Sequence, residues 1–305
     1  MGLQTLLTAQ DLLKDVEIGP VMVHDNLSVA PLFGENRLLE DVMPLHESFR
    51  YEGVVVLDQG SIDSLQLSNK LDRLLFIPNG AILEGLSQNR AAQWSVLVPP
   101  LATTQVSVYC VEQGQPIIPG TGYNGSTSMI TALLRNRPNA AHSVVDQQDA
   151  WKTIDRTMTS LDTRSATRSY VEIVQQADLG AYLEVFGEVQ SGQIGYVAGV
   201  HTRDGIALFS DRLGNNGLYG KLDSMLRESV ASAAAVSRNG TQGTGHEPID
   251  KDVLAAFMDN ARHTELIKRD ERTVGEMYVM LEPVEGMALT YKGDLVHMSF
   301  RQMNA

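Results

Sequence analysis

The feature that most constrains the fold is a series of short apolar runs that fills residues 18–111. Runs such as residues 54–57 and 105–111 are too short for typical helices and are rich in valine. Turn-forming residues, for example Asp58-Gln59-Gly60, stand between them. We therefore expect many short antiparallel strands in the N-terminal half, arranged as a sandwich or an open barrel.

The second half of the chain changes to helical spacing after a stretch rich in glycine and proline, residues 113–125. Apolar residues spaced by three and four predict helices over residues 128–134, 144–161, 218–233 and 248–261. Strands are predicted over residues 193–200, 206–210, 277–281, 287–291 and 295–300, and a linker over residues 237–247. The pattern indicates an α+β protein with a β-rich part at residues 17–115 and a mixed helix and strand part at residues 116–305. We expect the two parts to pack as one compact unit.

Charge and composition limit the classes of partner. The chain has 305 residues, with 24 Lys and Arg against 37 Asp and Glu, which gives a net charge of −13. Such a chain lacks the basic surface that binds bulk nucleic acid, although one small pocket for a nucleotide-like ligand remains compatible with it. No apolar run approaches the roughly 20 residues of a membrane span, so no membrane contact is expected.

The single cysteine, Cys110, excludes an intramolecular disulfide. The start of the chain also lacks the cationic and apolar segments of a signal peptide. We expect a cytoplasmic protein, and homo-oligomer formation stays open.

The most unusual polar feature is the tetrad Ser87-Gln88-Asn89-Arg90, which lies between segments that must be buried. Two amides and a guanidinium supply many fixed donors and suit a planar or anionic ligand. The alternative is a loop whose side chains satisfy free backbone groups at a sheet edge.

The strand that follows the tetrad ends with Cys110 and Glu112. If this strand pairs with the strand that leaves the tetrad, Glu112 is expected to lie near Arg90 and orient it. Strand alternation would place Cys110 and Glu112 on the same face. For Cys110 the alternative is a small buried apolar side chain.

Other candidate groups are weaker. Asp204, Asp211, His201 and His297 supply candidate acid–base groups, with ordinary surface carboxylates as the alternative. The segment 214–217, Gly-Asn-Asn-Gly, precedes a predicted helix and is either a plain turn or an anion cradle. The histidines lack metal-ligand spacing, so no metal site is predicted, and no cofactor can be named.

At the tetrad the chain resembles the ARG and Rhodanese-Phosphatase-superfamily-associated protein domain, where ARG stands for ADP-ribosylglycohydrolase. The matching text is EGLSQNR at residues 84–90, WSVLVPP at residues 94–100 and VSVYCVEQG at residues 106–114. Weaker similarity extends along nearly the whole chain. The family carries acidic residues where this chain has Ala81 and Ile82, and a lysine where it has Ser87.

The resemblance implies an α+β domain associated with NAD and ADP-ribose metabolism. It implies binding or processing of an ADP-ribose or NAD-derived nucleotide, with Gln88, Asn89, Arg90 and Cys110 as ligand-binding residues. Glu84 and Glu112 are the candidate catalytic residues if the protein is a hydrolase of ADP-ribose-type compounds. The alternative function is a non-catalytic interaction or scaffold protein in which the motif only stabilises a loop.

Overall fold

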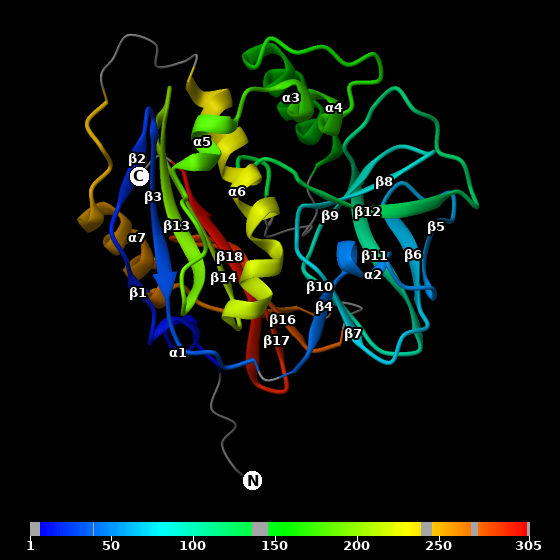
Figure 1. Cartoon of the computed structure of the whole chain (residues 1–305), viewed down its shortest axis with the longest axis horizontal. Coiled ribbons are helices and arrows are strands. Elements are labelled where there is room, and N and C mark those ends of the chain that lie inside the picture. The colour runs from blue at the N-terminus through cyan, green and yellow to red at the C-terminus, as the bar shows by residue number, and fades with distance from the viewer. Residues whose placement is uncertain (1–6, 39, 136–145, 239–245, 270–273, 304–305) are drawn as a thin grey trace.

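A computed structural model describes residues 7–38, 40–135, 146–238, 246–269 and 274–303. It confirms the α+β class and the β-rich N-terminal half. No helix among the described residues is both long and apolar enough to cross a membrane. Figure 1 shows a barrel on one side of the molecule and a large sheet on the other, with the long helix α6 between them.

The N-terminal half forms a closed six-strand barrel instead of an open one. Its order is β11-β6-β5-β12-β8-β9. The strands are β5 (Val54–Asp58), β6 (Ser64–Asn69), β8 (Ala81–Gly85), β9 (Arg90–Ala92), β11 (Ala102–Cys110) and β12 (Gly122–Met129). Beside it lies a small sheet of β10 (Val96–Val98), β7 (Leu74–Ile77) and β4 (Val42–Pro44), which runs into the short helix α2 (Leu45–Ser48).

The large sheet has the order β1-β3-β13-β14-β18-β17-β16-β15, with β2 paired to β3. Its strands are β1 (Glu17–Ile18), β2 (Met22–His24), β3 (Leu27–Phe33), β13 (Gln193–Thr202), β14 (Gly205–Leu213), β15 (Ile267–Arg269), β16 (Glu276–Met280), β17 (Glu285–Tyr291) and β18 (Asp294–Gln302). The sheets do not divide at residue 115, the predicted boundary between the two parts. The strands β1, β2 and β3 from before this boundary belong to the large sheet, and β12 from after it completes the barrel.

Helices cover both faces of the large sheet (Figure 1). On one face lies α6 (Asn216–Arg238) with α5 (Gly180–Glu184) beside it, and on the other lie α1 (Ala9–Leu13) and α7 (Lys251–His263). The helix α3 (Gln147–Ser160) packs against α6 and β11, and α4 (Tyr170–Gln176) packs against α3. The α6 helix packs its apolar stripe between the sheet and the barrel, and so joins the two halves into one hydrophobic core. The opposite face of the sheet packs a second core against α1 and α7.

Most of the predicted elements of the C-terminal half are present, with one exception among the described residues. The helix predicted over residues 128–134 does not form, because Met129 still belongs to β12 and a turn follows it. Of the linker predicted over residues 237–247, residues 237 and 238 are instead the last residues of α6, and residues 239–245 lie outside the described residues. In the segment 214–217, Gly214 and Asn215 form the bend before α6, and Asn216 and Gly217 are the first residues of the helix. Asn215 Oδ1 accepts a hydrogen bond from the backbone N–H of Leu218 at 2.7 Å.

Candidate functional site

The Gln-Asn-Arg motif enters the barrel at the start of β9. Arg90 pairs with Cys110 at the end of β11 and with Leu83 in β8, so it lies between two strands of the closed barrel. Its side chain has no solvent-exposed area. A charged group that is removed from water requires compensating partners, and these determine what the site can do.

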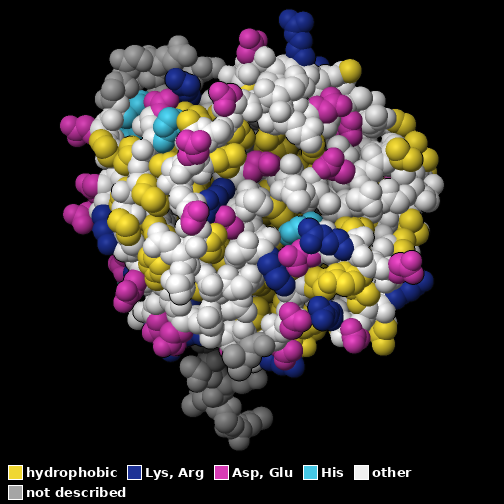
Figure 2. Space-filling model, viewed as in Figure 1, with side chains coloured by type: hydrophobic (Ala, Val, Ile, Leu, Met, Phe, Trp, Pro, Cys, Tyr) yellow, Lys and Arg dark blue, Asp and Glu magenta, His cyan; other side chains and the backbone are white. Residues whose placement is uncertain are grey.

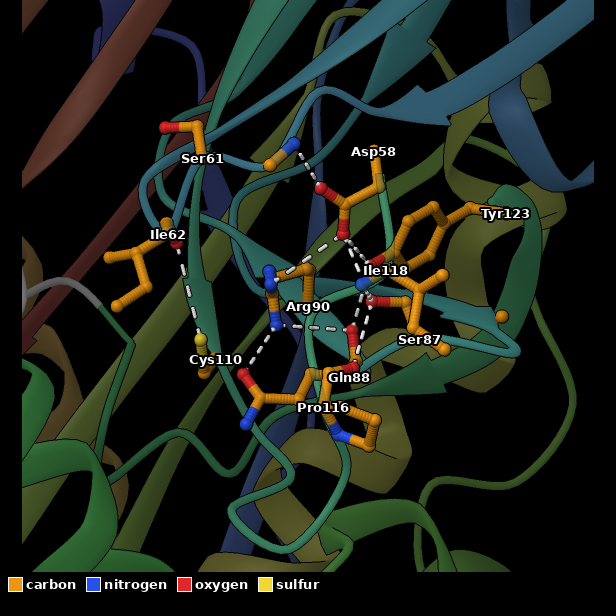
Figure 3. A network of polar contacts seen from close by, with 12 residues as sticks. Asp58, Ser61, Ile62, Ser87, Gln88, Arg90, Cys110, Pro116, Ile118 and Tyr123 are labelled. Carbon is orange, nitrogen blue, oxygen red and sulfur yellow. Dashed lines mark hydrogen bonds and ion pairs between the residues drawn. The ribbon is translucent and has the colours of Figure 1, made fainter. Parts of the chain in front are cut away.

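The partners of the Arg90 guanidinium are incomplete (Figure 3). Its Nη1 donates to the backbone oxygen of Gln88 at 3.1 Å and lies 3.0 Å from Gln88 Oε1. Its Nη2 lies 3.8 Å from Asp58 Oδ2, which is an ion pair but too long for a hydrogen bond. Nε and Nη2 have no hydrogen-bond partner. An unsatisfied buried donor costs about 1–3 kcal/mol, so these two N–H groups favour an additional acceptor.

Asp58, the last residue of β5, is the carboxylate at the centre of this cluster. It is fully buried, and its Oδ1 accepts a hydrogen bond from the backbone N–H of Gly60 at 2.7 Å. Its Oδ2 lies 3.0 Å from the hydroxyls of both Ser87 and Tyr123. Burial, above all, raises the pKa of Tyr123 to about 12, so the phenol stays protonated and can donate.

Ser87 connects the cluster to the loop over residues 113–121. Its Oγ lies 3.2 Å from the backbone oxygen of Pro116 and accepts a hydrogen bond from the backbone N–H of Ile118 at 3.1 Å. Figure 3 shows both loop residues lying against Ser87 and Gln88. The loop therefore closes the end of the barrel that contains Arg90.

Asn89 and Glu112 belong to a different set of contacts. Glu112 accepts hydrogen bonds from the backbone N–H of Asn89 at 3.2 Å and from Thr167 Oγ1 at 2.6 Å. The Asn89 side chain contacts Gly85 N at 3.3 Å and Ser169 Oγ at 3.3 Å. These residues connect the barrel to the segment before α4, and the carboxylate that faces Arg90 is Asp58 instead of Glu112.

The expected common face of Cys110 and Glu112 fails for a structural reason: β11 ends at Cys110, and Glu112 forms an isolated bridge with Ser169. Cys110 itself is buried, and burial raises the pKa of its thiol. The thiol therefore stays protonated and packs beside Arg90 as an apolar group, which does not suit it to act as a nucleophile.

Glu84 lies on the outside of the barrel. It stands opposite Asn124 in the pairing of β8 with β12, and it lines a shallow hollow with Leu86 and Tyr123. Glu84 thus does not share a site with Glu112. In the space-filling view, acidic side chains lie in the recess between α6 and the barrel (Figure 2).

Comparison with known proteins adds one decisive observation. The ARG and Rhodanese-Phosphatase-superfamily-associated Protein domain matches residues 15–301. The chain belongs to this family. No curated protein and no solved structure matches it. The family match spans both the barrel and the large sheet, so the domain is one structure built from both halves.

A second buried polar network of the domain joins its two halves. Arg135, which follows the barrel, pairs with Asp211 on β14 through Nη2–Oδ1 at 2.6 Å and Nη1–Oδ2 at 3.2 Å. His297 on β18 lies between Asp211 Oδ1 at 3.0 Å and Ser95 Oγ at 2.7 Å. Tyr196 also contacts Asp211. All these side chains are buried.

This network has the residue types of a serine hydrolase triad but not its accessibility. Ser95 Oγ already accepts a hydrogen bond from the backbone N–H of Asn79 at 3.0 Å, and the group has no exposed area. Burial holds the pKa of His297 below its usual value. Burial of Asp211 acts to raise its pKa, but the contacts with Arg135 and His297 outweigh this effect and hold the pKa well below its usual value. Asp211 and His297 are therefore together as the sequence suggested, but as a structural connection between barrel and sheet.

The other two acid–base candidates lie elsewhere. Asp204 is at the β13–β14 turn, and the ring of His201 contacts the backbone oxygen of Glu247 at 3.0 Å. Among the described residues, no group of three or more His, Cys, Asp or Glu side chains is arranged to hold a metal ion.

Sequence reasoning missed two residues of these clusters, Asp58 and Arg135. Asp58 was assigned only to a turn, although a carboxylate directly after an apolar strand was a usable signal. Nothing local indicated that Arg135 would reach across to β14.

Proposed function

We propose that this protein binds an ADP-ribose-type nucleotide at the loop-covered end of the barrel, with Arg90 as the residue that contacts phosphate. The observation that supports the proposal is the free donor edge of Arg90, since Nε and Nη2 are buried without hydrogen-bond partners. Arginine offers this edge in a planar, two-pronged geometry that matches two phosphate oxygens. Family membership favours an ADP-ribose-type compound as the source of that phosphate.

Binding requires the loop over residues 113–121 to move, because it covers the motif. The contacts that cover the motif are those of Ser87 with Pro116 and Ile118, and the 3.3 Å contact from Gln88 Nε2 to the backbone oxygen of Gln113. Backbone hydrogen bonds also hold the two ends of the loop, from Gln113 and Gly114 to Thr167 and between Asp58 and residues 120 and 121. Neutral hydrogen bonds of this kind contribute about 1 kcal/mol each, which an incoming ligand can offset. Gln88 would then be free to bind a ribose hydroxyl or a base edge.

The residues near Arg90 also indicate which reaction chemistry is accessible. Glu84 and Glu112 lie outside the cluster, whereas Asp58 is 3.8 Å from the guanidinium. If the protein hydrolyses its ligand, we propose Asp58 as the acid–base group in place of Glu84 and Glu112.

A specific observation favours the second candidate function, a non-catalytic interaction or scaffold protein. Arg90 and Asp58 have no exposed area, and Arg90 donates to the main-chain oxygen of Gln88. On that view the motif stabilises the barrel end and binds nothing.

Isothermal titration calorimetry with ADP-ribose and NAD separates the two. We expect a saturable heat with the wild type, no heat with Arg90→Gln, and an unchanged heat with the exposed matched control Arg156→Gln. Circular dichroism confirms that each variant is folded. If the wild type gives no heat at protein concentrations on the order of tens of micromolar, the nucleotide proposal is wrong. If Arg90→Gln lowers the melting temperature while binding is unchanged, the motif is structural.

A further inference from the structure

A second buried arginine without complete partners lies on the opposite face of the large sheet. Arg212 is on β14, directly after Asp211, and strand alternation turns it away from the buried Asp211 network towards α1. It is 1% exposed. Its Nη1 contacts the backbone oxygen of Leu12, and its Nε has no hydrogen-bond partner.

The charge of Arg212 also lacks an opposite charge. Among the described residues, no carboxylate forms an ion pair with it, whereas its neighbour Arg37 pairs with Asp15. Burial, and then the positive charge of Arg37, lower the pKa of Arg212 to about 10. Both guanidiniums donate to backbone oxygens near the end of α1, Arg37 to Asp11 and Arg212 to Leu12, and only Arg37 also has carboxylate partners.

A pocket of about 120 Å³ opens at this point. Lys14, Arg37 and Arg212 line it together with Asp11 and with Asp294, the first residue of β18. Asp11 is already engaged, since its Oδ2 accepts hydrogen bonds from the backbone N–H and Oγ1 of Thr8 at 3.1 and 2.6 Å. The volume is several times what a single water molecule needs.

We propose that this pocket binds a small oxyanion, a phosphate or a carboxylate, through Arg212 and Lys14. The buried Arg212 Nε–H supplies a fixed donor for one oxygen, and the exposed Lys14 ammonium supplies a mobile positive charge at the rim. The negative charge of Asp294, which also lines the pocket, opposes anion binding and so limits the affinity. The site is independent of the barrel, because Arg212 contacts α1 beside the large sheet, whereas Arg90 lies on β9 within the barrel.

Thermal unfolding in sodium phosphate, sodium acetate and sodium chloride at equal ionic strength tests the proposal. We expect phosphate or acetate to raise the melting temperature of the wild type relative to chloride, in a saturable manner. Whichever anion does so identifies the class of ligand. If the melting temperature in both phosphate and acetate equals that in chloride, the proposal is wrong.

Three variants assign the effect to the pocket without disturbing buried Arg212. Lys14→Gln is expected to raise the apparent dissociation constant about threefold, as for loss of one exposed charge, and Asp294→Asn to lower it by a similar factor. Lys152→Gln, an exposed change on α3, is the matched control and leaves it unchanged. Equal anion responses in all four proteins show that the effect arises elsewhere, and the proposal then fails.

Discussion

Replacing Glu228 with Gln is expected to stabilise the protein above neutral pH. Glu228 lies on α6 in the recess beside the barrel, where its Oε1 accepts a hydrogen bond from the backbone N–H of Met129 at 3.2 Å. Its Oε2 lies 3.4 Å from Ser128 Oγ. Burial, together with the negative charge of Glu84, raises the pKa of Glu228 from 4.5 to about 7.

The direction of the pH effect follows from this shift. A carboxyl group with a higher pKa in the folded than in the unfolded state favours folding when protonated. This contribution is complete below pH 4.5 and is lost as the pH rises through about 7. At about 1.4 kcal/mol per pKa unit, the rise corresponds to about 3 kcal/mol. Gln cannot ionise and keeps an oxygen for Met129, so at pH 8 Glu228→Gln should gain up to that amount.

Urea unfolding between pH 4.5 and 8.5 measures the effect, with the exposed Glu184→Gln on α5 as the control. The difference in free energy of unfolding between Glu228→Gln and wild type should grow with pH, because other titrating groups cancel in that difference. The control should show no such growth. A difference that is constant with pH, or a variant less stable than wild type at pH 8, would refute the reasoning.

Three further predictions concern the buried networks. Asp211→Asn should lower the free energy of unfolding by about 3–5 kcal/mol, because the charge of Arg135 stays buried without its partner; a loss below about 1 kcal/mol in urea would contradict this. Burial lowers the folded-state pKa of His297, so its contribution makes stability fall as the pH drops below 6.5, and His297→Asn should remove that part of the slope between pH 7 and 5.5. Tyr123→Phe should cost about 1–2 kcal/mol and weaken ADP-ribose binding, because Asp58 loses a hydrogen bond; calorimetry and urea unfolding together check both effects.

The sequence predicts the local elements well and the long-range pairing poorly. The β13–β14 hairpin and α6 were predictable, because a hairpin turn and an apolar stripe are properties of neighbouring residues. That β3 pairs with β13, across more than half the chain, depends on core packing that no local pattern records. Residues 128–134 were assigned to a helix because three-residue apolar spacing also occurs where a strand passes into a turn.

The same distinction holds at the candidate site. The pairing that the sequence suggested between the strand leaving the tetrad and the strand ending at Cys110 is present, with Arg90 opposite Cys110. The role of Asp58 required knowing that β5 and β9 belong to one closed barrel. Glu112 could not be placed, because the strand ends just before it and its partners lie in the segment before α4.

The most direct test of the central claim observes the Arg90 guanidinium itself. In ¹⁵N-labelled protein, the Nε–H resonance of Arg90 can be assigned by its loss in Arg90→Lys and followed while ADP-ribose is added. We expect a saturable shift of this resonance, because the Nε–H gains a phosphate oxygen as its acceptor. An Arg90 resonance that stays in place at saturating ADP-ribose would show that the guanidinium is structural and that the nucleotide, if bound, lies elsewhere.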